Sequence, residues 1–413
     1  MKKLAAALAA LLLLLAGAAL AYVLVKKKQA RDIRGSSTVE FVTTERIPTI
    51  PKELTTVQWP MYGFDPERAR AIGGVDLRPP FRKLWVAGGQ SLLEFPPVIA
   101  YRRLYYVNGG GTVYAVGAKN GGVAWRKRTG RCAASSPAVH EGSVFVALLN
   151  RPPCNAKKVT TGEVIAFSAG VGAIRWRTKI GPSESSPLVA NGLVYVGDWR
   201  GRMIALDERT GKIRWTFKTD GRIKDAPAYT AGTIFFGSYD HHLYALNAKN
   251  GKLRWKAAAQ PRFVGSSGTF YSTPAIAYGR VYIGSTDGKV YSFGATSGKL
   301  RWSQSTGGYV YASPAVWKRR VLIGSYSKKF YALDAATGDV RWSFKANGQI
   351  SGSPTVIGNL VYFATLKGRT YALNAATGKR VWTFPDGKYS PVVADRDRLY
   401  LIGYAKLYGL VPK

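Results

Sequence analysis

An eleven-residue phrase that ends in tryptophan recurs along the chain, and this repeat constrains the fold more than any other feature. It reads ALDAATGDVRW at residues 332–342 and ALNAATGKRVW at residues 372–382. Five related phrases begin at residues 115, 166, 205, 245 and 292, which makes seven copies. A period near 40 residues indicates a repeat architecture, in which each unit buries its apolar face against its neighbours.

Each unit is predicted to contain four short antiparallel strands, called A to D from the axis outward. Segments such as 193–197 (LVYVG) and 233–237 (TIFFG) are rich in the β-branched and aromatic residues that favour strands. Most copies of the phrase contain Thr-Gly or Asn-Gly, and glycine adopts a positive φ in a turn without steric cost. Four strands in about 40 residues are typical of a β-propeller blade.

The tryptophans predict the number of blades. One ends each phrase and an eighth precedes the first complete unit, which gives Trp85, Trp125, Trp176, Trp215, Trp255, Trp302, Trp342 and Trp382. Residues 390–410 supply three strands of a last blade without the fourth. We therefore expect strand 81–85 to complete that blade and close an all-β, eight-bladed ring that has no free edge. We expect the tryptophans to fill the wedges between blades rather than to bind a ligand.

The phrase A-x-D-x-x-T-G-x-x-x-W resembles the tryptophan-docking motif of proteins with pyrroloquinoline-quinone (PQQ)-like repeats. The resemblance extends from about residue 57 to the end, and residues 58–71 resemble the segment that precedes the first blade in that family. It implies the propeller fold but no particular activity. The family contains PQQ-dependent dehydrogenases, and also the cofactor-free lipoprotein of the outer-membrane barrel-assembly machinery.

A dehydrogenase that resembles this family would need calcium held by carboxylate and amide oxygens, and an aspartate base. Its alcohol-oxidising members have adjacent cysteines, whereas Cys132 and Cys154 are far apart. Glu94, Glu184 and Asp225 lie near the expected axis, but their spacing specifies no site. The other residues expected there are small and neutral: Ser136, Ser186, Ala226, Thr273, Ser313 and Ser353. We therefore expect no catalytic residue, metal or cofactor, and PQQ with calcium is the alternative.

The remaining motifs are weak. His241 and His242 occur in a predicted turn, where an exposed turn is a simpler interpretation than a metal site, and the third histidine is His140. The chain has 60 Lys+Arg against 23 Asp+Glu, a net charge of +37. Such a charge attracts anionic partners and says nothing of fold. Arginines before five of the tryptophans predict a ring of positive charge on the outer strands: Arg175, Arg214, Arg254, Arg301 and Arg341.

The apolar run from Leu4 to Val25 is long enough to cross a bilayer. Ala19-x-Ala21 also fits a signal-peptidase site, so a cleaved leader is the alternative to the uncleaved anchor that we expect. The flanking lysines favour a cytoplasmic propeller, whereas the signal-like sequence and the cysteines favour the extracytoplasmic location that we predict. The predicted division is an anchor at 1–25, a linker at 26–56 and the propeller at 57–413.

Two blades are longer than the others, through insertions at 150–162 and 257–272. Strand order places both on the face that carries the D–A and B–C connections, named the upper face. Insertions on one face often mark a binding surface, and neutral drift is the alternative. Cys132 and Cys154 fall on this face in one blade, so a disulfide is geometrically plausible, with two free thiols as the alternative.

The sequence thus predicts a membrane-anchored, non-enzymatic scaffold on the outside of the cytoplasmic membrane. Its expected partners are proteins or anionic envelope polymers. Nucleic acid is not expected, because the chain has no recognised nucleic-acid motif and carries an export-like N-terminus. The alternative is a PQQ- and calcium-dependent dehydrogenase, and a sensor ectodomain is a weaker third interpretation.

Overall fold

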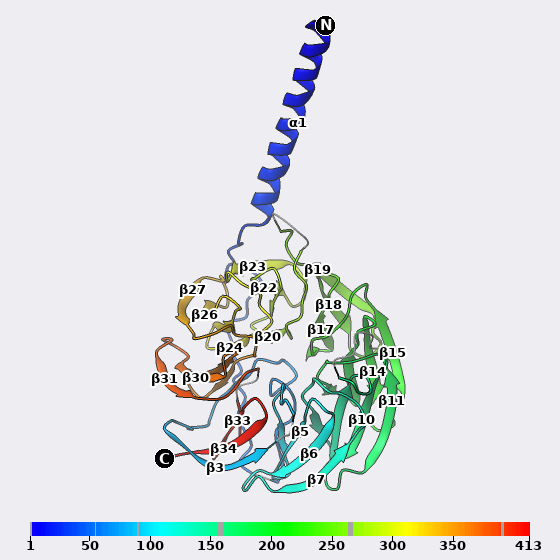
Figure 1. Cartoon of the computed structure of the whole chain (residues 1–413), viewed down its shortest axis with the longest axis vertical. Helices are drawn as coiled ribbons and strands as arrows, with labels where there is room; N and C mark the ends of the chain where they lie inside the picture. The colour runs from blue at the N-terminus through cyan, green and yellow to red at the C-terminus, as the bar shows by residue number, and fades with distance from the viewer. Residues whose placement is uncertain (1, 54, 89–90, 155–159, 263–266, 390–391) are drawn as a thin grey trace.

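The chain folds into a ring of eight blades with one long helix at its edge (Figure 1). This computed structural model describes residues 2–53, 55–88, 91–154, 160–262, 267–389 and 392–413. The helix, α1, comprises Lys2–Gln29. Within the described residues, one helix is long and apolar enough to cross a membrane, over Ala10–Gln29, and none of that stretch is buried. The expected eight-bladed propeller is confirmed.

The first four blades follow one another along the chain. Blade 1 consists of β4 (Val98–Ala100), β5 (Arg103–Val107), β6 (Thr112–Gly117) and β7 (Val123–Arg128). Blade 2 consists of β8 (Ala138–His140), β9 (Ser143–Leu148), β10 (Gly162–Ser168) and β11 (Ile174–Ile180). Blade 3 consists of β12 (Leu188–Ala190), β13 (Leu193–Gly197), β14 (Arg202–Asp207) and β15 (Ile213–Lys218). Blade 4 consists of β16 (Ala228–Thr230), β17 (Thr233–Gly237), β18 (His242–Asn247) and β19 (Leu253–Ala258).

The other four blades complete the circle. Blade 5 consists of β20 (Ala275–Ala277), β21 (Arg280–Gly284), β22 (Lys289–Gly294) and β23 (Leu300–Ser305). Blade 6 consists of β24 (Ala315–Trp317), β25 (Arg320–Gly324), β26 (Lys329–Asp334) and β27 (Val340–Lys345). Blade 7 consists of β28 (Thr355–Ile357), β29 (Leu360–Thr365), β30 (Arg369–Asn374) and β31 (Arg380–Phe384). Blade 8 consists of β32 (Val392–Ala394), β33 (Leu399–Ile402), β34 (Lys406–Pro412) and β3 (Phe81–Gly88).

The two ends of the propeller meet in blade 8. Strand β3 runs antiparallel to β34, from the pair Phe81 and Pro412 to the pair Gly88 and Lys406. Two short strands lie at the inner edges of other blades: β1 (Val57–Trp59) pairs with β4, and β2 (Ala71–Ile72) pairs with β28. The predicted closure by the N-terminal strand is confirmed, and it pairs the exposed edges that both chain ends would otherwise present.

The blade-end tryptophans connect neighbouring blades. The indole Nε1 of Trp176 donates a 2.9 Å hydrogen bond to the Glu208 carbonyl of the next blade. Three residues later Gly211 has a φ of +71°, and a Cβ there would lie 2.5 Å from the Trp176 ring. Equivalent indole bonds are made by Trp85, Trp125, Trp215, Trp255, Trp302 and Trp342. The glycine of the repeated phrase is therefore required both by its backbone angle and by the ring above it.

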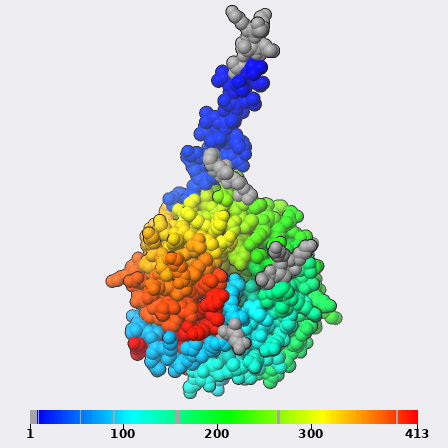
Figure 2. All heavy atoms as spheres, in the orientation of Figure 1, coloured from blue at the N-terminus to red at the C-terminus, as the bar shows by residue number. Residues whose placement is uncertain are grey.

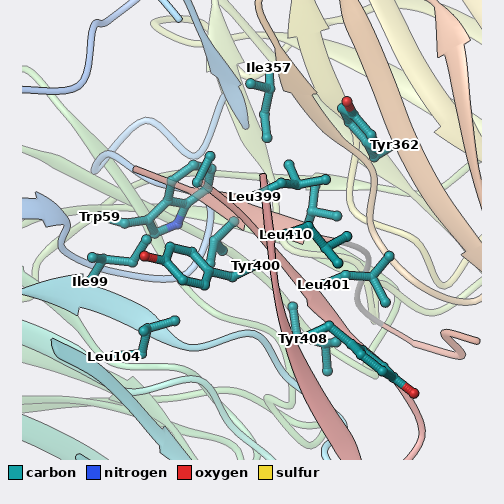
Figure 3. Close-up of a cluster of buried hydrophobic side chains, with 14 of the residues drawn as sticks. Trp59, Ile99, Leu104, Ile357, Tyr362, Leu399, Tyr400, Leu401, Tyr408 and Leu410 are labelled. Atoms are coloured by element: carbon teal, nitrogen blue, oxygen red, sulfur yellow. The ribbon is translucent and has the colours of Figure 1, made fainter. Parts of the chain in front are cut away.

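Trp382 faces the point where the two chain ends meet, and it differs from the others. The next blade has no continuous C–D turn there, because β34 and β3 come from opposite ends of the chain. Trp382 packs edge-on against Phe81 at 5.2 Å, and no indole hydrogen bond is present within the described residues. Figure 3 shows part of the core beside this closure, where Tyr400 and Leu410 of blade 8 lie near Trp59.

The aspartate of the repeated phrase stabilises its own turn. Asp207 Oδ1 accepts hydrogen bonds from the backbone N–H and the hydroxyl of Thr210, at 2.9 and 2.8 Å. Its Oδ2 accepts from Arg214 at 2.7 Å. The hydrogen bonds from Arg214 and Thr210 lower the pKa of Asp207 to about 2. The phrase at residues 205–215 thus combines a turn that its own aspartate stabilises with a glycine that the neighbouring ring covers.

Part of the segment predicted to be a linker lies against the propeller. Gln260 Nε2 donates to the carbonyls of Gln29 and Arg31, at 3.2 and 3.1 Å. Lys289 Nζ donates to the Ala30 carbonyl at 2.6 Å. The last residue of α1 is therefore bonded to the connection between blades 4 and 5, the next residue is bonded to blade 5, and α1 projects from the rim of the ring (Figure 2).

Contacts continue along this segment. The buried Arg280 side chain donates to the carbonyls of Ser36 and Glu40, at 3.0 and 2.6 Å. The Glu40 carboxylate pairs with Arg301 and accepts from Ser297 at 2.7 Å. Residues 30–40 therefore form a strap across the outer side of blade 5, which is named the blade 5 strap.

Candidate functional site

The small residues that precede each A strand tie the blades together around the axis. The backbone N–H of Ser136 donates to the Ser186 hydroxyl at 2.9 Å. The same bond joins Thr273 to Ser313 at 3.0 Å and Ser313 to Ser353 at 2.9 Å. These hydroxyls are structural links between neighbouring blades. The sequence placed them at the axis correctly, but it did not reveal what they do there.

The segment from Trp59 to Ile72 occupies the axial channel beneath these residues. Its carbonyls accept hydrogen bonds from inner strands of several blades, for example Pro60 from Val139 at 2.7 Å and Ala69 from Val316 at 2.8 Å. We name residues 60–72 the axial plug. The backbone of the axial plug is hydrogen-bonded to the inner strands that form the wall of the channel. The axial plug is therefore an integral part of the fold.

Three buried side chains of the axial plug, those of Tyr62, Arg68 and Arg70, lie at the axis. Arg68 is fully buried and donates to the carbonyls of Pro227 and Pro187, at 3.0 and 3.3 Å. Burial lowers the pKa of Arg68 to about 9. The Tyr62 hydroxyl lies 2.9 Å from the Ser353 hydroxyl, and the Arg70 guanidinium stacks over the Tyr62 ring at 3.9 Å. The plug therefore supplies the floor of whatever space remains above it.

That space is a pocket on the axis, open toward the upper face, with a volume of about 60 Å³. Its walls come from seven of the D–A connections, and we name it the axial pocket. The lining includes three carboxylates, Glu94, Glu184 and Asp225, and one ammonium, Lys224. It also includes five aromatic rings: Tyr62, Phe95, Tyr271, Tyr311 and Tyr389.

The acidic groups of the axial pocket are perturbed. Burial, with repulsion from Glu184 in second place, raises the pKa of Glu94 to about 7. Burial also raises the pKa of Glu184, against the attraction of Lys224. Asp225 is 3% exposed and its pKa is raised well above the usual value by burial. Perturbed groups gathered in a cleft are characteristic of binding and catalytic sites.

Lys224 is held at the side of the axial pocket by rings and a carboxylate. Its Nζ lies 3.1 Å from a Glu184 carboxylate oxygen and 4.3 Å from the centre of the Trp199 ring. The rings of Tyr239 and Tyr271 lie at 5.9 and 5.8 Å. An ammonium over aromatic faces is stabilised by the ring quadrupoles. The arrangement fixes the position of one positive charge beside the pocket.

Aromatic side chains continue outward from the pocket over the upper face. Tyr271 contacts Tyr311 at 5.3 Å, and Tyr311 contacts Tyr326 at 4.9 Å. Tyr309 and Tyr404 are the most open, with 49% and 52% exposed. We name the whole set the aromatic collar: Trp199, Tyr239, Tyr271, Tyr309, Tyr311, Tyr326, Tyr389 and Tyr404. Half-exposed aromatic rings of this kind are enriched in protein–protein interfaces.

The axial pocket does not fit PQQ. Pockets for ligands of that size occupy about 300 Å³ or more, whereas this one has about 60 Å³ because Tyr62 and the axial plug fill the channel. The Lys224 ammonium also pairs with Glu184. The charge of this carboxylate is therefore already balanced and is not free to bind a calcium ion. Among the described residues, the axial carboxylates do not form a group close enough to share a metal ion.

One group of potential metal ligands lies elsewhere, and the sequence did not single it out. His140, Glu141 and Glu208 place ligand atoms within 4.8 Å of one another, on the lower face between blades 2 and 3. His140 Nδ1 is already 2.6 Å from Glu208 Oε1, which makes a hydrogen bond sufficient to explain the contact. His242 Nδ1 bonds the backbone carbonyl of Asp240 at 2.8 Å, and His242 is the first residue of β18, whereas His241 lies in the predicted turn.

The two insertions have separate roles in the described residues. The Sγ atoms of Cys132 and Cys154 are bonded, with the Cα atoms 5.4 Å apart, so the first insertion is fastened to the start of its own blade. In the second, Gln260 binds the end of α1 and Phe270 is fully buried. Residues 155–159 and 263–266 of the insertions lie outside the described residues.

The expected ring of arginines is present but partly neutralised. Arg214 pairs with Asp207 and Arg341 with Asp334, each at 2.7 Å and within one blade. Arg301 pairs with Glu40 of the blade 5 strap. These three arginines form ion pairs that stabilise turns and the blade 5 strap. Their charge is therefore less available to an anionic partner than the sequence suggested.

Comparisons with known proteins agree with this architecture. The family model described as outer membrane protein assembly factor BamB matches residues 62–151, 160–309 and 303–413. The tetrathionate hydrolase of Acidithiobacillus ferrooxidans is 28% identical over 136 residues, which span 28% of this chain and 27% of that enzyme. The chain therefore matches only about a quarter of the length of this curated relative.

Two similar crystal structures show the same fold. BamB from Moraxella catarrhalis has a TM-score of 0.65 at 18% identity, covering 81% of this chain and 98% of that chain. A quinohemoprotein alcohol dehydrogenase from Pseudomonas putida HK5 has a TM-score of 0.72 at 15% identity, covering 87% and 80%. Since the family model matches most of the residues, this chain belongs to the family described as outer membrane protein assembly factor BamB, whose members are propellers of PQQ-like repeats.

Proposed function

We propose that this protein is a non-enzymatic scaffold that binds protein partners on its upper face. The observation that carries the proposal is the filled channel: the axial plug leaves a pocket of about 60 Å³ where a quinone enzyme needs room for its cofactor. Around this pocket the aromatic collar offers an exposed surface suited to a partner. The family description, an assembly factor for outer membrane proteins, supports a scaffold role.

The location of the scaffold is part of the proposal. We take α1 as an uncleaved anchor and the propeller as extracytoplasmic, and the Cys132–Cys154 disulfide supports an oxidising compartment. Because Gln260 binds the Gln29 carbonyl, a membrane-spanning α1 holds the rim of blade 5 at the bilayer surface. The upper face would then lie roughly perpendicular to the plane of the membrane, so that partners approach it parallel to the membrane surface. Non-reducing peptide mapping that recovered unlinked Cys132 and Cys154 peptides would remove this support.

Anionic envelope polymers are a second class of partner in the proposal, on the ground of the net charge of +37. The pairing of Arg214, Arg301 and Arg341 with carboxylates weakens this option. Binding to a polymer should fall steeply with salt because it depends on screened charge, whereas docking on the aromatic collar should depend on salt weakly.

Titration with PQQ tests the enzyme alternative. The full chain in detergent is titrated with PQQ and calcium, with the tryptophan fluorescence as the signal and dye reduction on alcohols or sugars as the activity. We expect no saturable change up to tens of micromolar PQQ and no dye reduction. Stoichiometric binding accompanied by turnover would overturn the proposal and make this chain an oxidoreductase.

A further inference from the structure

The axial pocket gathers acidic groups in a molecule that has few of them. The chain has 23 acidic residues against 60 basic ones, yet Glu94, Glu184 and Asp225 converge on one small pocket from blades 1, 3 and 4. Carboxylates and aromatic rings are the two groups that stabilise an organic cation. A pocket lined by both is suited to a positive charge, although the net charge of the chain is +37.

One carboxyl oxygen of Asp225 is buried at the wall of the axial pocket without a hydrogen bond from the described residues. Its Oδ2 accepts a 2.7 Å hydrogen bond from the Gly237 N–H, whereas Oδ1 has no hydrogen-bond partner among the described residues. The side chain is 3% exposed and lines the axial pocket. Buried polar atoms are nearly always bonded, so an orphan oxygen at a pocket wall calls for a donor from a ligand or from water.

One cationic side chain of the protein is already bound by a carboxylate and an aromatic ring beside the axial pocket. Lys224 places its ammonium 3.1 Å from Glu184 and over the Trp199 ring, at the side of the same pocket. The charge of Glu184 is matched by this contact. A cation in the pocket would also meet the carboxylate of Glu94 and the unbonded oxygen of Asp225, with the rings of Tyr271 and Tyr311 as walls.

The size of the pocket selects the ligand. A volume of about 60 Å³ holds a few water molecules, since each needs about 10–15 Å³. A ligand as large as a nucleotide cannot enter, but the end of one side chain can. The rest of the molecule to which this side chain belongs must then lie outside the axial pocket, on the aromatic collar.

We propose that the axial pocket receives one cationic head group, the ammonium of a lysine or the guanidinium of an arginine, from a protein docked on the aromatic collar. The inference rests on the proposed scaffold function and specifies how the upper face recognises a partner. The head group donates to Glu94 and to the orphan oxygen of Asp225, and it lies against the tyrosine rings. Its binding releases to solvent the proton that burial otherwise keeps on Asp225.

The titration of Glu94 makes the proposal dependent on pH. Glu94 is influenced by Glu184 from blade 3 and Lys224 from blade 4, and in turn it acts on Tyr271 and Tyr389. Burial raises the pKa of Glu94 to about 7, so most of its charge is lost by pH 6. Affinity for a cation should therefore fall about tenfold between pH 8 and pH 6, as the ionised fraction of Glu94 falls.

The experiment is a ligand-observed NMR titration of the full chain in detergent with n-butylammonium and n-butylguanidinium. Butanol and butyrate serve as matched neutral and anionic probes. We expect saturable binding of the two cations at pH 8, at least tenfold weaker for Glu94→Gln and unchanged for Glu141→Gln, a glutamate of the lower face. Equal binding of all four probes, or no effect of Glu94→Gln in a variant with wild-type melting temperature, would overturn the proposal.

Two further arms separate the source of the cation and guard against misfolding. The Nα-acetyl amide of lysine should bind as well as butylammonium, whereas spermidine binding a hundredfold tighter would point to a free polyamine and contradict the side-chain source. The pH dependence of the wild type needs no variant, and a flat profile from pH 6 to 8 would also overturn the proposal. Failure of these titrations leaves the scaffold function open, because PQQ binding and partner docking are measured separately.

Discussion

At the scale of single residues, the repeated phrase is explained by one contact between blades. The tryptophan of one blade covers the glycine of the next and donates to the carbonyl three residues before it, as Trp176 does with Gly211 and Glu208. An aspartate or an asparagine folds the turn that presents this glycine in four of the seven copies. The tryptophan and the glycine recur in every copy because of the geometry of the blade interface, and ligand binding is not needed to explain them.

The difference between Trp176 and Trp382 gives a test. Trp176→Phe removes the indole donor and leaves the Glu208 carbonyl without that partner, which should cost about 1–3 kcal/mol of unfolding free energy. Trp382→Phe should cost less than about 1 kcal/mol, because Trp382 packs on Phe81 without such a bond within the described residues. Urea denaturation followed by circular dichroism measures both. Equal losses for the two variants would contradict this account of the closure.

The buried carboxyl of Asp225 predicts how stability changes with pH. Burial raises its pKa above the ordinary 3.8, so the folded state holds a proton that the unfolded state releases. Stability is therefore highest below pH 3.8 as far as this group is concerned, and it falls as pH rises through the folded value. Asp225→Asn should remove this part of the pH dependence and be at least as stable as the wild type at pH 8. Chemical denaturation between pH 4 and pH 8 tests it, and an unchanged slope in the variant would exclude Asp225 as its source.

At the scale of elements, the blade 5 strap and β3 fasten the start of the chain to its far end. Strand β3 completes blade 8, while the strap crosses blade 5 through the contacts of Arg280 and Glu40. The helix α1 is therefore joined to the propeller through a segment that is itself bonded to the propeller. Movement of the body relative to the anchor requires these contacts to break.

Removing Glu40 should release the blade 5 strap. Glu40→Ala breaks the contacts with Arg301 and Ser297, so trypsin should cleave at Arg34 at least fivefold faster than in the wild type. Glu53→Ala, an exposed glutamate outside the strap, is the matched control and should leave the rate unchanged. Mass spectrometry of timed digests gives the rates. If Glu40→Ala were cleaved at the wild-type rate, Glu40 would not be what holds the strap.

At the scale of the whole molecule, the sequence predicts the fold well and the site poorly. The blades were countable because each repeats one phrase with one tryptophan. The axial pocket could not be predicted, because its walls combine single residues from many blades at positions outside the phrase. Glu94, Glu184 and Asp225 were noted without a reason to join them, and Lys224 and the aromatic collar were missed. A tyrosine or tryptophan recurring in B–C turns, as in Trp199, Tyr239 and Tyr326, was the signal available.

The contact between the blade 5 strap and the propeller was also beyond the sequence. Residues 26–56 have the mixed polar composition of a linker, and their partners Gln260, Arg280 and Lys289 are more than 200 residues away. Pairings of this kind depend on the curvature of the ring, which brings the outer side of blade 5 to the end of α1. Local patterns carry no information on such distant contacts.

The central claim, that partners dock on the aromatic collar of the upper face, is tested most directly by site-specific photocrosslinking in cells. A photoreactive amino acid replaces Tyr309 or Tyr404 on the collar, and Ile213 or Val340, similarly exposed at the outer strands, as controls. We predict discrete crosslinked products from both collar positions, lost when a Glu94→Gln change is added, and none from the outer strands. Crosslinks from the outer strands with none from the collar would contradict the account.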